Sequence, residues 1–176
     1  RIATSGNRIL LGICGAPGAG KSTLAEALAE ELGAHLAVVV PCDGFHLASP
    51  LLRGTPLAER RGAIDTFDLG SYRALLQRLR DRDDQVVYAP AFDRRIEEPV
   101  ASAIRVPADV PLVITEGNYL LAAEPDMERA RRLLDEVWFL DLPDEVRLTR
   151  LVARHVRFGK GPDAASAWAH GPDQAN

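Results

Sequence analysis

Nine residues near the start of the chain have the types and spacing needed to hold a polyphosphate. Residues 15–23 read GAPGAGKST and fit the pattern Gly, any four residues, Gly, Lys, Ser or Thr without a mismatch. Glycines let backbone N–H groups wrap closely around phosphates. Lys21 would add a mobile charge for the β- and γ-phosphates, and the Ser22 hydroxyl is a hard oxygen that suits Mg²⁺. The motif predicts an ATP-binding loop made of Gly15, Ala16, Pro17, Gly18, Ala19, Gly20, Lys21, Ser22 and Thr23.

Two acidic residues follow apolar runs and complete a candidate site for phosphoryl transfer. Asp43 comes after the run at 36–40, with Gly44 beside it for close approach, and is the candidate to position and deprotonate a substrate hydroxyl. Glu116 follows the run at 112–115 and would hold Mg²⁺ through water. Each could instead be an ordinary residue that caps a turn. The predicted metal-side residues are Ser22, Asp43 and Glu116.

Four arginines recur at spacings of three and four after Pro143, on one face of a predicted helix. Arg150 and Arg154 would close over the nucleotide phosphates, with Arg154 neutralising charge that develops on the transferred group, and Arg157 would face the substrate. A solvated helix face with cations near its C-terminus explains the same pattern, so both interpretations stay open for these three. Arg147 better fits a structural role.

The elements that must position these groups are predicted from apolar runs at 9–14, 36–40, 112–115 and 137–140. The runs are continuous, as in strands covered on both faces, and helical segments separate them, which predicts an α/β parallel sheet. Such sheets bind ligands beyond the carboxyl ends of their strands. The loop, Asp43 and Glu116 should therefore meet there. Asp141 falls at the same edge but more simply caps the next helix.

The irregular stretch at 44–110 is interpreted as an insertion that supplies a substrate pocket, although an ordinary connection is the alternative. It contains a predicted amphipathic helix at 69–82 and a short strand at 85–88. His46 lies close enough to Asp43 to reach the same pocket, or it is a loop histidine without a task. Three aromatic residues could form apolar pocket walls or belong to the core: Phe45, Tyr88 and Phe92.

Composition limits the possible partners. The chain has 176 residues, 47% of them hydrophobic, and a net charge of −4, which predicts one domain over 1–176 without a field that would attract nucleic acid or an anionic membrane. No apolar run approaches a membrane span, so we expect a cytoplasmic protein in which Cys14 and Cys42 are reduced. The sequence is expected to be less than the full gene product.

Five segments in order carry a resemblance to a known family: the phosphate-binding loop, then Asp43-Gly44-Phe45-His46, Thr66-Phe67-Asp68, Phe92-Asp93-Arg94 and Glu116-Gly117-Asn118-Tyr119. Together they resemble the uridine kinase-like branch of P-loop kinases, which includes pantothenate kinase and phosphoribulokinase. The resemblance implies a P-loop NTPase three-layer sandwich with a parallel sheet of order 2-3-1-4-5, whose last strand is expected to lie outside this chain.

The resemblance also implies roles for single residues. It makes Asp43 the base, Glu116 the carboxylate on the metal side, and 150–165 a lid. An aspartate matching Asp68 holds ribose hydroxyls in uridine kinases, and the loop that lies against the base is altered here over 88–93, which puts uridine in doubt. The substrate-binding residues predicted in this way are Asp43, Phe45, His46, Asp68, Tyr88, Phe92, Asp93, Asn118 and Arg157.

These observations favour an ATP- and Mg²⁺-dependent kinase for a hydroxyl group of a nucleoside-like metabolite. A pantothenate, sugar or sugar-phosphate kinase, and a nucleotide-binding protein without catalysis, remain alternatives, and a homodimer is one arrangement the sequence leaves open. A GTPase switch would need an Asn-Lys-x-Asp motif, and a transport ATPase a Leu-Ser-Gly-Gly-Gln signature; the sequence contains neither.

Overall fold

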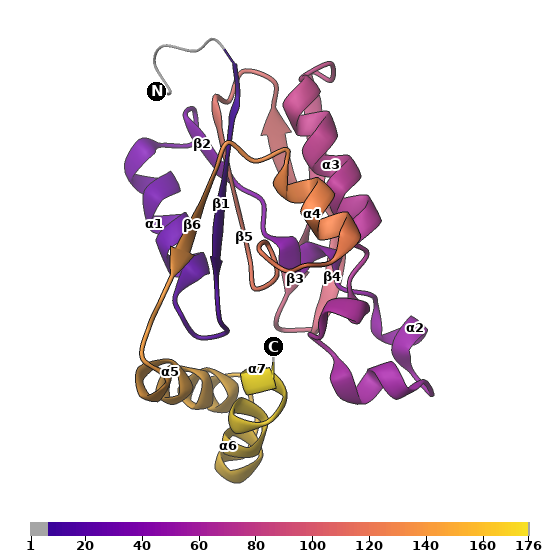
Figure 1. The fold of residues 1–176 in the computed structure, drawn as a ribbon, viewed down its shortest axis with the longest axis vertical. Helices are drawn as coiled ribbons and strands as arrows, with labels where there is room; N and C mark the ends of the chain where they lie inside the picture. Colours follow the sequence, from indigo (N-terminus) through magenta and orange to yellow (C-terminus); the bar gives the residue numbers. More distant parts are fainter. Residues whose placement is uncertain (1–6, 176) are drawn as a thin grey trace.

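The computed structural model describes residues 7–175, which form a parallel β-sheet with helices on both faces (Figure 1). The sheet strands are β1 (Ile9–Gly15), β2 (Ala37–Val39), β5 (Leu112–Gly117) and β6 (Glu136–Leu140). They lie in the order β2-β5-β1-β6, and every neighbouring pair is parallel. Counted within this sheet the order is 2-3-1-4. No fifth strand joins it within residues 7–175, so the complete five-strand order stays a prediction.

Each face of the sheet is buried under its own helices, which explains why the strand sequences are continuously apolar. On one face, α1 (Lys21–Leu32) packs against Leu11, Ile13 and Ile114. The opposite face carries α3 (Leu69–Asp81) and α4 (Pro125–Arg131), which bury Leu10 and Val113. Neighbouring strand residues therefore enter different cores, and the two cores fix the sheet between its helices.

The stretch between β2 and β5 folds into short helical turns, α3 and a hairpin. Its short elements are η1 (Cys42–Phe45), α2 (Ser49–Leu52), η2 (Pro56–Arg60) and η3 (Ile64–Thr66). The hairpin pairs β3 (Val86–Asp93) with β4 (Glu98–Pro107) in an antiparallel ladder whose register shifts between Ala89 and Ala91. The sequence indicated only a short strand at 85–88. β4 escaped prediction because half of its residues are exposed and its sequence shows no apolar alternation.

Three helices lie beyond the carboxyl ends of the sheet strands (Figure 1). They are α5 (Asp144–Arg157), α6 (Pro162–His170) and α7 (Pro172–Ala175). α5 begins after Pro143 with two acidic residues in its first turn, as predicted, and acidic side chains there favour the helix dipole. None of the helices within residues 7–175 combines the length and the apolar character that crossing a membrane requires.

Candidate active site

The phosphate-binding motif forms a tight loop between β1 and the first turn of α1. Gly18 has φ +81°, and a Cβ there would lie 2.6 Å from the backbone oxygen of Arg147 and 2.8 Å from the Leu151 side chain on α5. Only glycine fits both the conformation and this close approach. Arg147 is itself buried and donates from Nη1 to the Pro17 carbonyl at 3.3 Å. The start of α5 is thereby fixed directly to the loop.

Lys21 points from the start of α1 into the site and is held by neutral oxygens. Its Nζ donates to Asn118 Oδ1 at 2.6 Å and to the Ala16 carbonyl at 3.2 Å, and the residue is 7% exposed. Burial lowers the pKa of Lys21, while the nearby Glu116 carboxylate opposes this effect. Among residues 7–175 this desolvated cation has no direct carboxylate partner, which is a favourable arrangement for an incoming phosphate.

Glu116, at the end of β5, faces Ser22 and is almost completely buried. Ser22 Oγ donates to Glu116 Oε1 at 2.8 Å. Burial, followed by repulsion from Asp43, raises the pKa of Glu116 to about 7. A cation beside such a carboxylate would strongly stabilise its ionised form. A serine hydroxyl and two carboxylates are oxygen donors that fit Mg²⁺, which takes few protein ligands where phosphates and water complete its shell. Ser22, Glu116 and Asp43 would hold it.

Asp43 lies on the turn η1, directly after β2, and is oriented by two neighbouring elements. Its Oδ2 accepts from Arg94 Nη2 at 2.9 Å, and His46 Nδ1 lies 2.7 Å from the Asp43 backbone oxygen. Burial lowers the pKa of His46, which favours its neutral ring. A Cβ on Gly44 would collide with the carbonyl of Pro90, so the turn packs directly against the hairpin. The carboxylate is held in one place before any substrate arrives.

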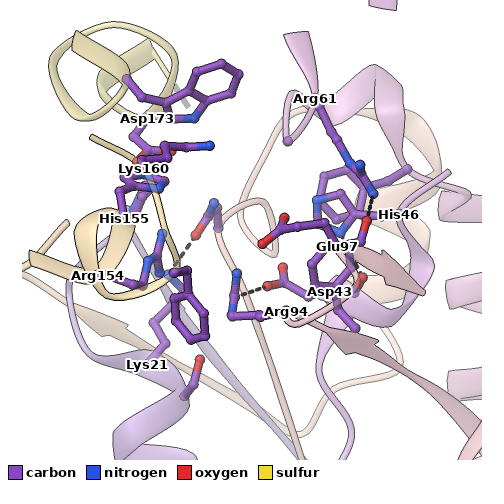
Figure 2. A pocket seen from close by; sticks show the side chains of 18 of the residues that line it. Lys21, Asp43, His46, Arg61, Arg94, Glu97, Arg154, His155, Lys160 and Asp173 are labelled. Atoms are coloured by element: carbon purple, nitrogen blue, oxygen red, sulfur yellow. Dashed lines mark hydrogen bonds and ion pairs between the residues drawn. The ribbon is translucent and has the colours of Figure 1, made fainter. Parts of the chain in front are cut away.

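These groups line one cleft of about 370 Å³, which Figure 2 shows from close by. Lys21, Arg154 and Lys160 lie on one side, and Asp43, His46, Arg61 and Arg94 lie on the other. We use the term acceptor wall for His46, Arg61, Phe67, Phe92 and Arg94, all of which line the cleft. The His46 ring lies between Phe67 and Phe92, at centroid distances of 4.0 and 4.9 Å.

The helices α5, α6 and α7 form the opposite wall of the cleft. The Arg154 side chain lines it and, among the described residues, forms no hydrogen bond or ion pair. Burial and then repulsion from Arg94 lower the pKa of the Arg154 guanidinium, although the carboxylates of Asp173, Asp43 and Glu116 oppose this effect. His155 Nε2 meets Asp173 Oδ2 at 2.7 Å, which ties α5 to α7. Lys160 lies over the Trp168 ring, 4.9 Å from its centroid.

Several residues predicted for the site come together in this cleft, and others do not. The cleft is lined by the predicted residues Pro17, Lys21, Ser22, Asp43, His46, Phe92, Glu116, Asn118 and Arg154. The rest of the phosphate-binding motif forms the loop and first turn around them: Gly15, Ala16, Gly18, Ala19, Gly20 and Thr23. Arg150 stands beside the loop, since a Cβ on Gly20 would be 3.7 Å from its Nη1.

The remaining predicted substrate residues lie outside the cleft. Phe45 is buried in the core, with its ring edge against Tyr72 at 5.3 Å. Asp68 caps α3 by accepting from the Ser71 N–H at 2.9 Å. Tyr88 is 54% exposed on the hairpin, and Arg157 is exposed on α5. Asp93 pairs with Arg95 and lines a separate, shallow hollow.

Sequence reasoning gave no role to several side chains that line the cleft, namely Arg61, Phe67, Glu97, Trp168 and Asp173. Arg61 lies in an irregular stretch without periodicity, and its contacts reach Glu97, 36 residues away. No local pattern reports such a contact. Arg94 could have been found, because it belongs to the Phe92-Asp93-Arg94 segment that the resemblance already singled out.

Comparisons with known proteins agree with this geometry. A scan against protein-family models gives no match. The chain is 36% identical over 160 residues to "Putative uridine kinase C227.14" of Schizosaccharomyces pombe, covering 86% of this chain and 68% of that protein. It is 38% identical over 132 residues to "ATP-dependent kinase-like protein notR'" of Aspergillus versicolor, covering 71% and 77%.

A solved structure shows the same fold. The "putative fructose transport system kinase" from Silicibacter sp. TM1040 superimposes with a TM-score of 0.88 at 39% identity, over 98% of this chain and 84% of that one. With the phosphate-binding loop, the parallel sheet and the named relatives in agreement, the chain belongs to the uridine kinase-like family of P-loop kinases.

Proposed function

We propose that this P-loop kinase transfers the γ-phosphoryl group of ATP to a hydroxyl group of a small, nucleoside-like or similar metabolite, with Asp43 as the base. One observation carries the proposal: a single cleft joins the phosphate-binding groups Lys21 and Ser22 to an oriented carboxylate, Asp43, and to the acceptor wall. Phosphoryl transfer needs mainly such positioning and charge neutralisation, because the protein does little covalent chemistry.

The position of each residue in the cleft determines its proposed role. The loop and Lys21 bind the β- and γ-phosphates, and Arg154 approaches them from the lid, which we assign to 150–165. Mg²⁺, when bound beside Ser22 and Glu116, neutralises phosphate charge and orients the phosphates. The helices α5 and α6 and the acceptor wall enclose the reacting atoms and exclude water that would otherwise hydrolyse ATP.

In the transfer step the acceptor hydroxyl oxygen attacks the γ-phosphorus. A new oxygen–phosphorus bond forms, the bond between the γ-phosphorus and the β–γ bridging oxygen breaks, and ADP leaves. The hydroxyl proton passes to Asp43. Arg94 holds that carboxylate at 2.9 Å in the orientation that receives the proton, and therefore acts as a positioning residue.

The test is Mg²⁺-dependent ADP release with a panel of nucleosides, sugars, sugar phosphates and hydroxy acids, in the wild type and in Asp43→Asn. The variant keeps the size and shape of the side chain but cannot accept the proton, so we expect kcat to fall roughly 10²- to 10⁴-fold while ATP affinity stays within a few-fold. Asp65→Asn is the matched control, because Asp65 pairs with Arg60 outside the cleft. Unchanged turnover in Asp43→Asn would remove Asp43 as the base.

A further inference from the structure

We propose that the acceptor carries an anionic group, a carboxylate or a phosphate, and that Arg61 binds this group. The inference rests on the proposed function, because it concerns the second substrate of that reaction. It is carried by the placement of two guanidinium groups on the acceptor wall: Arg94 forms a close ion pair with Asp43 at 2.9 Å, whereas Arg61 lies 3.7 Å from the carboxylate of Glu98.

Arg61 is fixed in place before any ligand binds. Its Nη1 donates to Ser49 Oγ at 2.7 Å, and its Nη2 donates to the backbone carbonyl of Glu97. The guanidinium lies over the Phe92 ring, 5.6 Å from the centroid. A guanidinium held by such contacts loses little freedom on binding an anion, which favours recognition of a planar carboxylate or a phosphate.

The charge of Arg61 is poorly compensated by the protein. Its hydrogen-bond acceptors are neutral oxygens, and its Nε is buried and has no hydrogen-bond partner within the described part of the chain. The carboxylate that approaches it, Glu98, stays 3.7 Å away and instead accepts from the Ser49 N–H at 3.0 Å. Glu97 carries a carboxylate on the same rim, but that residue is exposed, so solvent screens its charge.

Arg94 provides the contrast within the same wall. It lies over the same Phe92 ring at the same 5.6 Å, yet it is paired with Asp43 at 2.9 Å. Its charge is therefore committed to orienting the base. Of the two arginines beside Phe92, Arg61 is the one that can bind an anion without disturbing the catalytic carboxylate.

The opposite wall adds a second available cation. Lys160 lines the cleft and contacts the Trp168 ring, and among residues 7–175 it has no carboxylate partner. The ATP phosphates are already served by Lys21 and Arg154, so Arg61 and Lys160 remain for another anion. With a neutral acceptor, the closest carboxylate to the Arg61 guanidinium among residues 7–175 would still be Glu98, at 3.7 Å.

Isothermal titration calorimetry tests the inference on protein saturated with Mg²⁺ and a non-hydrolysable ATP analogue, so that the nucleotide phosphate sites are already filled. The probes are matched pairs that share their hydroxyl groups: glycerate with glycerol, pantothenate with pantothenol, and ribose 5-phosphate with ribose. We expect the anionic member of at least one pair to bind at least about 10-fold more tightly than its neutral partner. The first two pairs report a carboxylate site and the third a phosphate site.

Two substitutions assign any discrimination to Arg61. Arg61→Met should reduce the preference for the anionic member to within about 3-fold, and Arg61→Gln, which keeps hydrogen bonding toward Ser49 and Glu97, should do the same if the methionine variant folds poorly. Arg60→Met is the matched control, because Arg60 pairs with Asp65 outside the cleft and should leave the preference intact.

Equal binding of anionic and neutral partners in every pair would overturn the inference, as would failure of every anionic probe to bind or a preference that survives both Arg61 substitutions. Binding of the nucleotide analogue is measured first and reports on the proposed function separately. A protein that binds the analogue but shows no preference for anions refutes only the acceptor class. One that does not bind the analogue refutes the kinase proposal instead.

Discussion

Glu116 should cost the folded protein stability at neutral and alkaline pH, and Glu116→Gln should recover it. The residue is 4% exposed, and its pKa rises from 4.5 to about 7 on folding because of burial and the nearby Asp43. The folded state therefore holds a proton that the unfolded state has already released over this interval. The stability contributed by Glu116 is fully present below about pH 4.5 and is lost as the pH rises to about 7.

The magnitude follows from the two pKa values. At about 1.4 kcal/mol for each pH unit, the interval corresponds to at most roughly 3 to 4 kcal/mol, of which roughly 2 to 3 kcal/mol is lost between about pH 5 and about pH 8.5. Glutamine keeps the oxygen that accepts from Ser22 but cannot ionise. The free energy of unfolding of Glu116→Gln relative to the wild type should therefore rise by this amount over the same pH range.

The assay is urea-induced unfolding of the wild type and the variant at both pH values, without nucleotide or metal. Comparing the difference between the proteins at two pH values cancels all groups that titrate alike in both. Glu26→Gln, on the exposed side of α1, is the control and should show no such pH-dependent gain. If the difference between Glu116→Gln and the wild type does not change with pH, the fold does not hold Glu116 protonated and the reasoning is wrong.

Two further predictions concern the phosphate-binding loop. Asn118→Ala removes the oxygen that holds Lys21 Nζ at 2.6 Å, so ATP affinity should fall roughly 10-fold. As the pH is raised, the affinity of the variant should also begin to decline at a lower pH than that of the wild type. An unchanged affinity and pH profile in a fluorescence titration would exclude a positioning role for Asn118. Gly18→Ala should reduce stability by roughly 1 to 3 kcal/mol more than Gly54→Ala in thermal unfolding. Both glycines have positive φ, but only at Gly18 would a Cβ meet other atoms, so equal losses would contradict the packing of α5 on the loop.

The sequence predicted the catalytic edge of the sheet more fully than the acceptor wall. Lys21 and Ser22 belong to a motif with fixed local spacing, and Asp43 and Glu116 follow apolar strands whose carboxyl ends must meet in a parallel sheet. Phe45 shows the limit of this reasoning. It is only two residues from Asp43, but the η1 turn directs its ring into the core against Tyr72.

The acceptor wall could not be predicted because its contacts join segments that are distant in the chain. Arg61 is placed by Ser49 and Glu97, and Arg94 reaches Asp43 across 51 residues. These contacts depend on the β3–β4 hairpin, whose second strand has no apolar alternation. Because the sequence does not predict that strand, no sequence pattern indicates that Arg61 and Arg94 both contact the Phe92 ring.

The acceptor wall has a consequence for how specificity can diverge among related kinases. All five of its residues come from two short stretches, 46–67 and 92–94, while α3, which lies between them in the sequence, packs its apolar side chains into the core. Under the proposed function, acceptor recognition is thus encoded apart from the nucleotide-binding loop, although Phe67 also packs against the core that contains α3. Exchanging those two stretches between relatives should retarget the enzyme while its handling of ATP remains that of the host.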